Sequence, residues 1–544
     1  MRANSRAMAV AGISAVALLA TACGGDSDSD STDAGSAGGA GKTGGEIVMG
    51  GCNPENPLVA GNTAETCGGD VLDVLTAKLM KYDPATAEAS EDIAESIETE
   101  DNQNFTVKIK KGYKFHDGTE VKAKNFVDAW NYTAFGPNAQ QGGYFFEPIE
   151  GYEEVSGEDS KVKELSGLKV VDDYTFTIKT TGKVSNLPLR LGYTAFAPQP
   201  DSFFENEDKE AFGKSPVAAG PYKFVSWEDN KSIVLEKFAD YSGERGGQVD
   251  KITFQIFQDQ DAEYTALQAG QVDIIRQVPA SALVDDTYKT DLPDRNLDEP
   301  NSTLQFLGLN YKVDKKLADV KVRQAISMAI DRPTIIKEIF NNAFTPATGW
   351  VSPVVDGYKE GACGEYCTYD PEKAKQLLEE GGGYDGKLTL TYNGDGGHKE
   401  WTEAVCNSIK NAIEIDCVAT PTVDFATMLT ALGEREVKGL YRMGWVMDYP
   451  SIENYLAPIY GKGASSNYSD FDSPEFQKKM AEANAAATPE EANALYQEAE
   501  GIVAEDFTTI PTWYGKTIIG WSEKVDNVKA TPFGNPDLTQ VTVK

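Results

Sequence analysis

Histidine is almost absent from this sequence, which contains only His116 and His398 among 544 residues. Histidine is the usual general base of enzymes and their commonest metal ligand, so its scarcity argues against most hydrolases and metalloenzymes. The patterns His-Glu-x-x-His and Gly-x-Ser-x-Gly, which mark zinc proteases and serine hydrolases, do not occur either. The 85 Asp and Glu residues guarantee chance carboxylate pairs and carry no specific signal. We therefore expect no catalytic residues, no metal site and no cofactor.

Positive charge is also scarce, because 50 Lys and Arg face 85 Asp and Glu and leave a formal net charge of −35. A nucleic-acid-binding protein needs the opposite excess to neutralise phosphates, so we expect no nucleic-acid partner. Hydrophobic residues make up 40% of the chain, which is enough for extensive cores. A chain of this length forms one large multi-lobed body or two to four domains.

Long hydrophobic runs are missing as well. The apolar stretch near the N-terminus, AVAGISAVALLATA, is shorter than the roughly 20 residues that span a bilayer. It follows Arg2 and Arg6 and precedes Cys23, so residues 1–22 are predicted to be an export signal. The motif LLATAC resembles a bacterial lipobox, which implies that Cys23 is lipidated and becomes the mature N-terminus. The alternative is an ordinary cleavable signal in which this cysteine is incidental. Residues 23–45, rich in Gly and Ser, are predicted to form a flexible tether after the lipidated cysteine.

Cysteine is used sparingly, with seven residues in the whole chain. Without Cys23 six remain, an even number that favours disulfides in an exported protein. Six cysteines allow many pairings, but their positions suggest three local pairs. A zinc site would need clustered Cys-x-x-Cys and His spacing, which is missing. The suggested pairs are Cys52 with Cys67, Cys363 with Cys367, and Cys406 with Cys417.

Strand-like and helix-like patterns alternate along the chain and predict a mixed α/β fold. Phe105, Val107 and Ile109 alternate with polar residues, and Asp117–Gly118 then predicts the tight turn of a hairpin. The segments 174–181 and 232–238 have the pattern of further strands.

Helical spacing marks several other segments, beginning with residues 124–135. Pro333 lies inside a long helical pattern and is expected to kink that helix or to start a new one. Asp370 precedes a proline and an apolar stripe and is predicted to be a helix N-cap. Thr488, with Glu491 three residues later, predicts a capping box.

One acidic residue has unusual neighbours, in the segment GWVMDYPSIENYLAPIY at 444–460. Asp448 stands there among Trp445, Met447 and Tyr449. Apolar surroundings make a bare carboxylate unfavourable, so a compensating partner is expected. That partner belongs either to the protein itself or to a bound ligand.

Seven segments resemble, in order, the family 5 solute-binding proteins of ABC importers, which include oligopeptide-, dipeptide- and nickel-binding members. Each segment alone is a modest match, but seven in the same order are specific, and they span nearly all of the chain after the tether. The segments are FTVKIKKGYKFHDGTEVKAKNFVDAW, AAGPYKFVSWEDNKSIVLEKFADY, ALQAGQVDI, LNYKVDKKLADVKVRQAISMAIDR, YDPEKAKQLL, GWVMDYPSIENYL and LYQEAEGIVAEDFTTIPTWY.

The resemblance implies an α/β, two-lobed fold like that of periplasmic binding proteins, of type II and of the large class with an extra inserted domain. Lobe I is expected to be discontinuous in sequence, and domain III is expected to close over the ligand. The expected boundaries are 46–67, 176–300 and 511–544 for lobe I, 68–175 for the inserted domain II, and 301–510 for domain III.

The resemblance also implies the partners and the location of the protein. We expect a monomer outside the cytoplasm, held at the cell membrane by the lipid on Cys23. It is expected to bind a short peptide and to deliver it to the transmembrane subunits of an ABC permease.

The stretch from YNGDGGHKEW to YRMGWVMDYPSIENYL is most similar to the oligopeptide-binding branch of the family. In peptide binders of that branch, the aspartate at the position of Asp448 receives the α-ammonium group of the peptide. An arginine at the position of Arg442 meets a carboxylate, and His398 matches a further contact to a peptide terminus. As alternatives, Asp448 caps a helix or forms an internal ion pair, and Arg442 balances Glu434 or Glu436.

An extended peptide also gains affinity when its backbone pairs with strand edges, whatever its side chains are. We expect two such edges, in the segments CNPENP and GWVM. Prolines in the first segment leave mainly carbonyl groups for pairing. The expected ligand-binding residues are Asn53, Glu55 and Asn56 in the first segment, and Trp445, Val446 and Met447 in the second.

Other ligands suit the same fold, namely an oligosaccharide or a metal chelate, whereas nickel alone fits poorly with two histidines. A sugar would stack on aromatic rings and would not need Asp448 near Arg442. A receptor that senses a peptide without importing it is a further alternative, as is a secreted hydrolase. Incubating peptides with the pure protein distinguishes the hydrolase, and we expect no turnover.

Overall fold

The computed structural model describes residues 43–394 and 397–544. The predicted export signal (1–22), the lipidation site Cys23 and nearly all of the tether therefore lie outside the described residues. None of the described helices combines the length and apolar character that crossing a bilayer requires.

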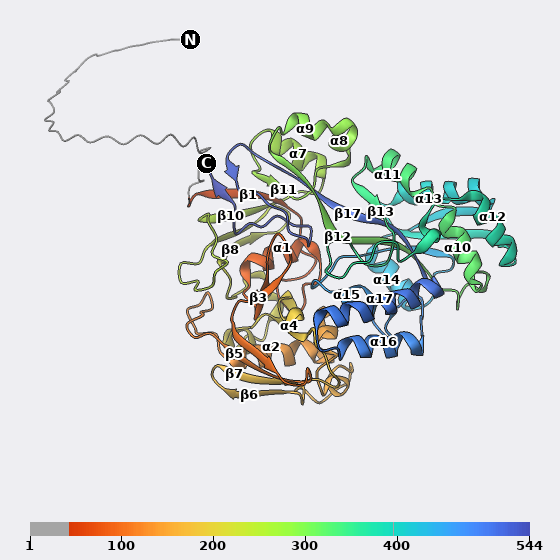
Figure 1. Cartoon of the computed structure of the whole chain (residues 1–544). Coiled ribbons are helices and arrows are strands. Elements are labelled where there is room, and N and C mark those ends of the chain that lie inside the picture. The colour runs from red at the N-terminus through yellow and green to blue at the C-terminus, as the bar shows by residue number, and fades with distance from the viewer. Residues whose placement is uncertain (1–42, 395–396) are drawn as a thin grey trace, which may run out of the picture. The chain divides into compact units, whose positions relative to one another are not determined.

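A single large mixed sheet organises the described chain (Figure 1). Strand β1 pairs in parallel with β10 and β11, and β14 pairs in parallel with β15 and β16, whereas the other pairings are antiparallel. Mixed α/β architecture is thus confirmed. The strands in spatial order are β15 (Asp416–Thr422), β14 (Lys387–Asn393), β16 (Leu440–Trp445), β12 (Asn296–Leu309), β17 (Thr509–Trp521), β11 (Ile274–Ile275), β1 (Glu46–Gly51), β10 (Lys251–Ile256), β9 (Ser232–Lys237) and β8 (Tyr222–Glu228), with β13 (Phe344–Pro346) paired to β17.

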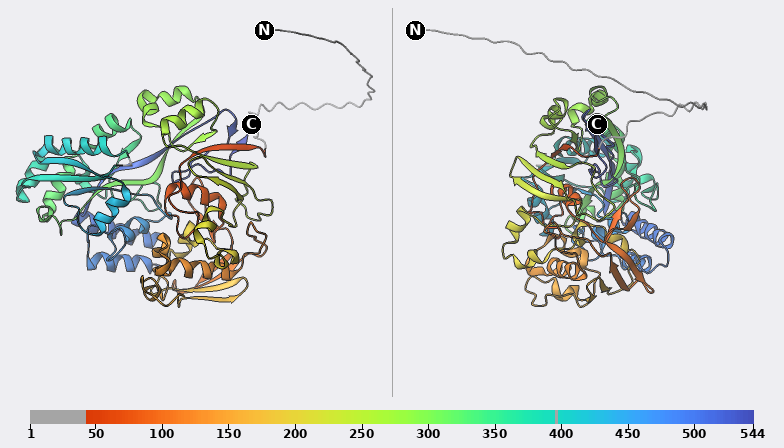
Figure 2. Two further views of the ribbon diagram at one scale, coloured as in Figure 1. Left: turned by 180° about the vertical axis from the view of Figure 1, so that it is seen from behind. Right: turned by 90° about the vertical axis from the view of Figure 1, so that its left-hand side faces the viewer.

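Two long strands, β12 and β17, connect the two halves of this sheet, as the left view of Figure 2 shows. Near Trp521, β17 pairs with β11, and near Thr509 it pairs with the far end of β12, which also pairs with β16. The register of β12 shifts between Pro300 and Leu304. Proline has no N–H for the ladder, so an irregularity beside it is the expected adjustment.

Three large clusters of buried side chains surround the sheet. The large core is formed mainly by residues between Leu304 and Tyr514 and includes Met447. The small-sheet core is formed by residues between Ala77 and Ala219, joined by Tyr449. The N-terminal core is formed by residues between Ile47 and Leu75, between Ala218 and Ile274, and between Ile519 and Val541.

Helices cover the half of the sheet that holds β14 and β15. In Figure 1, helices α10, α12 and α13 gather at this end, and α16 and α17 run beside each other. These helices are α10 (Val320–Met328), α11 (Arg332–Phe340), α12 (Pro371–Glu380), α13 (Lys399–Ile413), α14 (Phe425–Gly433), α15 (Glu453–Tyr460), α16 (Pro474–Asn484) and α17 (Pro489–Asp506).

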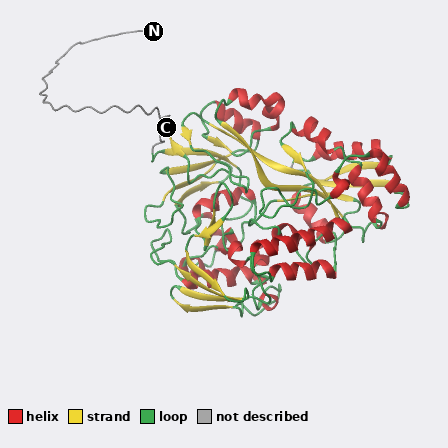
Figure 3. Ribbon diagram, viewed as in Figure 1, coloured by secondary structure: helices red, strands yellow, loops and turns green. Residues whose placement is uncertain are grey.

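A separate four-stranded sheet packs on the small-sheet core, at the lower left of Figure 3. Its strands are β4 (Ala94–Thr99), β5 (Asn104–Ile109), β7 (Thr175–Lys179) and β6 (Leu168–Asp172), in this spatial order. The predicted alternation in β5 is confirmed, because Phe105, Val107 and Ile109 are all buried. The helix predicted over 124–135 is α2 (Ala123–Ala134), whose Trp130 is fully buried in the same core.

One expected domain boundary is wrong in detail. The division between residues 175 and 176 assigns most of β7 to lobe I, but β7 pairs with β5 and β6 of the small sheet. Residues as far as Phe196 still contribute to the small-sheet core, so the chain leaves this unit later than expected. Assigning β7 to lobe I separates it from the ladders that it forms with β5 and β6 of the small sheet. The remaining lobe boundaries stay predictions.

The remaining elements connect these units. They are α1 (Thr66–Leu75), β2 (Met80–Tyr82), β3 (Ala89–Glu91), η1 (Gly136–Asn138), η2 (Gln141–Phe146), α3 (Tyr152–Val155), α4 (Leu187–Arg190), η3 (Thr194–Phe196), α5 (Asp201–Glu205), α6 (Lys209–Lys214), α7 (Gln260–Gln268), α8 (Ala280–Leu283), η4 (Val284–Asp286), α9 (Thr287–Asp291), η5 (Lys315–Leu317), η6 (Gly364–Cys367), β18 (Val525–Asp526) and β19 (Thr542–Val543).

The predicted helix ends are largely confirmed. Pro333 separates α10 from α11 and sits in the first turn of α11, whose N-cap is Asp331. Asp370 caps α12 by accepting a hydrogen bond from the Lys373 N–H. Thr488 caps α17, but the capping box is only half formed. The Glu491 carboxylate accepts from the N–H of Ala487, one residue before the cap.

The turn at Asp117–Gly118 is also present, closed by the Phe115 N–H donating to the Thr119 carbonyl. Gly118 has φ +88°, a conformation that glycine adopts without strain. His116 accepts the N–H of Ala218 at Nδ1, so its Nε2 donates to the Gly220 carbonyl. Burial lowers the pKa of His116 to about 4, which keeps the ring neutral and gives it a structural role.

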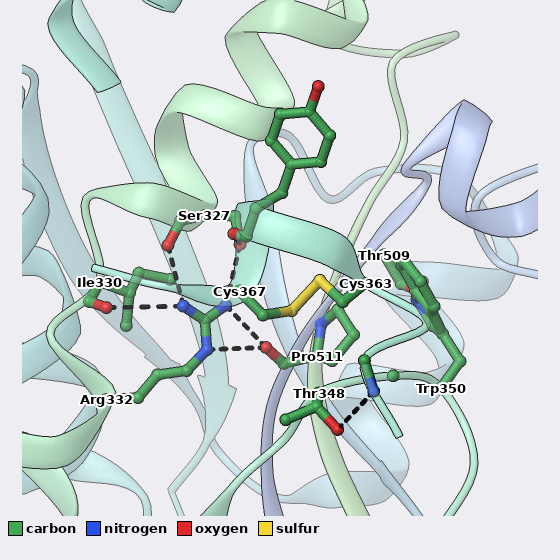
Figure 4. The surroundings of a disulfide bond; sticks show 12 residues. Ser327, Ile330, Arg332, Thr348, Trp350, Cys363, Cys367, Thr509 and Pro511 are labelled. Atoms are coloured by element: carbon green, nitrogen blue, oxygen red, sulfur yellow. Dashed lines mark hydrogen bonds between the residues drawn. A yellow bond between two sulfur atoms is a disulfide. The ribbon is translucent and has the colours of Figure 1, made fainter. Parts of the chain in front are cut away.

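All three suggested disulfides are confirmed, with Cα–Cα distances of 5.3, 5.8 and 4.8 Å in chain order. Figure 4 shows the second, Cys363–Cys367, beside the buried Arg332. The Arg332 guanidinium donates to the Pro511 carbonyl and to the Ser327 hydroxyl at 2.7 and 2.8 Å. Backbone oxygens thus satisfy this buried cation and join α11 to β17.

Candidate functional site

Asp448 lies in the loop that connects β16 to α15. Its own N–H donates to the Asn454 side-chain oxygen at 2.8 Å, and the Asn454 amide donates back to the carboxylate at 3.0 Å. The indole N–H of Trp445 also donates to the Asn454 oxygen, at 3.1 Å. Asn454 therefore fixes both the loop and the direction of the carboxylate.

The Asp448 carboxylate has only neutral partners among the residues that the structure describes. Burial raises its pKa to about 7, and the charge of Glu453 acts in the same direction. The hydrogen bond from Asn454 and the nearby Tyr193 phenol oppose this shift without cancelling it. No salt bridge to Asp448 forms within residues 43–394 and 397–544. A carboxyl in this state gains most from an added cation.

The two structural alternatives for Asp448 are not observed in this part of the chain. Helix α15 has Ile452 as its N-cap residue, without a side-chain cap, so Asp448 is not a helix cap. The acid that does form an internal ion pair is the nearby Glu453, whose partner is Arg190. Among the described residues, none therefore supplies the positive charge that was expected beside Asp448.

Tyrosines from distant parts of the chain surround the carboxylate. Burial raises the pKa of each phenol, and the negative charge of Asp448 raises it further. They come from β2, from η2, from the turn after α4 and from α15, and three of them are only half-buried. The four residues are Tyr82, Tyr144, Tyr193 and Tyr455.

Arg442 lies on β16, at the edge where the parallel strands β14, β15 and β16 end. Ligands of open α/β sheets bind at such carboxyl ends. The Arg442 guanidinium donates to the Asn393 side chain at 3.2 Å and lies 5.7 Å from the ring centre of Phe425. Its pairing with Glu434 or Glu436 stays a prediction.

The segment GWVM lies only partly on a strand, because β16 ends at Trp445 and is followed by Val446 and Met447. β14 pairs with β16 at Leu440 and Tyr441, whereas β12 pairs with β16 as far as Trp445. The end of β16 is therefore paired on one side only within the described ladders. Val446 is 46% exposed, but Met447 is buried in the large core, so its side chain does not line a site.

The segment CNPENP differs from the expectation, because it is a loop and not a strand edge: β1 ends at Gly51. Pro54 and Pro57 remove two of its N–H groups, which explains why the ladder stops. Asn53 exchanges hydrogen bonds with Asn230 in the β8–β9 turn. The Glu55 N–H donates to Glu65, the N-cap of α1, and Asn56 is half-buried beside them.

His398 precedes α13, and its Nδ1 accepts the indole N–H of Trp401 at 3.1 Å. This contact orients the ring along its own helix.

The structure brings together Asp448, Trp445 and the tyrosines, whereas Arg442 and His398 belong to the neighbouring strand ends. Sequence reasoning missed Asn454 and the tyrosines. Asn454 was detectable, since it lies in the same segment as Asp448.

A family model described as bacterial extracellular solute-binding proteins, family 5, matches residues 88–467. The chain belongs to this family. The oligopeptide-binding protein OppA of Bacillus subtilis is 25% identical over 442 residues, covering 79% of this chain and 80% of OppA. The dipeptide-binding protein DppE of Bacillus subtilis is 25% identical over 526 residues, covering 91% and 92% of the two chains.

Solved structures support the same fold. The murein tripeptide binding protein MppA of Escherichia coli superposes with a TM-score of 0.78 at 21% identity, covering 93% of this chain and 99% of MppA. This family member therefore has the expected type II fold of periplasmic binding proteins. The family consists of extracellular binding proteins and not of enzymes.

Proposed function

We propose that the protein binds short peptides outside the cytoplasm and delivers them to the membrane subunits of an ABC importer. One observation carries this proposal: Asp448 is a carboxylate with a raised pKa, held by neutral donors and without a described ion-pair partner. A ligand with an ammonium group supplies the missing charge. The relatives OppA and DppE are an oligopeptide-binding and a dipeptide-binding protein, which agrees with such a ligand.

In the proposed complex the α-ammonium group of the peptide meets Asp448 and the surrounding tyrosines. A charge-assisted hydrogen bond of this kind contributes roughly 1.5–3 kcal/mol net. The peptide backbone pairs with the one-sided end of β16, while Arg442 at the strand ends receives a carboxylate. Val446 and the loop with Asn53, Glu55 and Asn56 form the walls.

We also propose that the protein acts as a monomer without a cofactor, anchored by a lipid on Cys23. The three disulfides are consistent with an oxidising compartment outside the cytoplasm. Labelling of the expressed protein with a fatty-acid analogue tests for the lipid on Cys23, with Cys23→Ser as the control.

The decisive test is Asp448→Asn, which keeps the shape of the side chain and removes its charge. We expect trialanine to bind this variant roughly tenfold or more weakly, because the charge-assisted bond is lost. Isothermal titration calorimetry measures the affinity, and the melting temperature checks that the fold is intact. N-acetyl-trialanine, which has no ammonium group, serves as the matched ligand. An affinity within twofold of the parent removes Asp448 as the anchor.

A further inference from the structure

A buried ion pair lies directly beside the anchor carboxylate. Arg190 on α4 approaches Glu453 on α15 to 3.2 Å, and the two side chains are 10% and 4% exposed. No other ion pair in the described part of the chain has both side chains so well buried. Asn186 and the Tyr449 hydroxyl donate to the same carboxylate, at 3.3 and 2.6 Å.

The pair connects two different hydrophobic cores. Helix α4 belongs to the small-sheet core through its residue Leu187, and Leu191, which follows the helix, belongs to the same core. The loop before Glu453 belongs to both cores, since Met447 is buried in the large core and Tyr449 in the small-sheet core. The Arg190 guanidinium lies 5.4 Å from the centre of the Tyr449 ring. Asp448 therefore stands at the point where the chain passes from one core to the other.

The same short turn also reaches the anchor itself. The Tyr193 N–H donates to the Arg190 carbonyl at 3.0 Å, so both residues share one turn after α4. Tyr193 and Asp448 each affect the pKa of the other, which places the phenol near the carboxylate, while Arg190 pairs with Glu453, five residues further along the chain. A displacement of this turn moves both contacts together.

We propose that Arg190 and Glu453 form a latch between the large core and the small-sheet core, closed when a ligand occupies Asp448. The ligand class rests on the function proposed above, whereas the latch rests on the contacts between the cores. If the two cores separate, both charged groups are exposed to water and the ion pair breaks. Ligand contact with Asp448 and Tyr193 favours the arrangement in which the latch is closed.

The latch acts as a positioning device and does not contact the ligand. Removing one partner leaves the other charge buried and unpaired in the closed state only, which lowers the population of that state. The apparent affinity falls with this population. All peptides are then weakened by a similar factor, whatever their side chains are.

The test uses Glu453→Gln and Arg190→Met in the full-length protein, with trialanine as the probe. We expect each variant to bind roughly 10- to 100-fold more weakly. The double variant recovers part of this loss, because no charge stays unpaired. The melting temperature of the empty protein changes little, since its open state exposes both charges. Arg435→Met is the control, because its pair with Asp470 lies beside the large core alone.

Small-angle scattering of the proteins as purified gives an independent measure. We expect a larger radius of gyration for Glu453→Gln than for the parent and the Arg435→Met control. The latch proposal is wrong if Glu453→Gln and the parent have equal radii and affinities within twofold of each other. It is also wrong if the variant melts at a lower temperature but binds trialanine as tightly as the parent. If trialanine binds neither parent nor control while the difference in radius persists, the peptide proposal fails and the latch stands.

Discussion

The behaviour of Asp448 depends on three side chains that lie close to it in space. Asn454 donates a hydrogen bond to the carboxylate, the nearby Tyr193 lowers its pKa, and Glu453, which is already paired with Arg190, adds negative charge. Burial of the carboxyl outweighs the two lowering contributions and raises its pKa to about 7. This group is therefore close to half protonated at neutral pH before any ligand arrives.

We expect peptide affinity to depend on pH in one direction. An ammonium ligand needs the ionised carboxylate, so below pH 7 its binding must first remove a proton from Asp448. The affinity for trialanine should fall by up to about tenfold per pH unit below pH 7. Above pH 7 it should be nearly constant until the peptide amine itself loses its proton near pH 8. Calorimetry at pH 5.5, 6.5 and 7.5, in buffers of different ionisation enthalpy, measures both the affinity and the proton released.

The Asp448→Asn variant is the control for this prediction, because its weaker binding should not vary with pH over this range. Linkage also gives the sign for the empty protein. The folded pKa of Asp448 lies above its unfolded value of 3.8, so its contribution to stability is complete below pH 3.8. It is lost as the pH rises through about 7. Equal trialanine affinity at pH 5.5 and 7.5 contradicts the anchoring role.

At the residue level the sequence carries local signals only, and the ligand-binding residues inferred from them stay predictions. Asp448 was recognisable because its immediate neighbours are apolar and aromatic. Tyr193 and Arg190 were not, because they approach the anchor only after about 260 residues of chain have folded around the large sheet. No periodicity or motif connects such positions, so only the tertiary structure assembles them.

At the level of elements, helix termini were predictable because a cap is a contact over three residues. Asp370 and Thr488 both accept the N–H three residues later, as their side chains require. The small sheet was harder to predict from the sequence, since β7 pairs with β5 across about 70 residues of intervening chain. The expected boundary at 175 followed the sequence order and not the hydrogen bonds.

The disulfides differ in the length of chain that they close, which gives a prediction at this level. Cys52–Cys67 closes a separation of 15 residues and Cys363–Cys367 one of 4. Loss of the first should lower the free energy of unfolding by about 3 kcal/mol, and loss of the second by about 2 kcal/mol. The double variants Cys52→Ser/Cys67→Ser and Cys363→Ser/Cys367→Ser, unfolded in urea, measure the difference. A larger loss for the second pair contradicts the loop-length argument.

At the level of the whole molecule, the fold is that of the family, and the ligand must be inferred from the site and not from the fold. The family match and the order of strands place β16, Asp448 and the tyrosines at one junction of two cores. The resemblance of seven ordered segments to the family already implied this architecture. The preferred length and side chains of the ligand depend instead on the depth of the closed site. That depth depends on side chains from many separate segments, so no single sequence motif predicts it.

The ligand that the protein carries from the cell is therefore the most direct test at this scale. A closed two-lobed site releases its ligand slowly, so part of it should survive purification. Native mass spectrometry of the protein as purified should show a ladder of added masses that fragment into peptides, because backbone pairing and a charged anchor accept many side chains. Asp448→Asn, purified in parallel, should carry less of this material, whereas Arg435→Met should carry as much as the parent. A series of added masses spaced by hexose units would replace the peptide with an oligosaccharide while leaving the fold assignment intact.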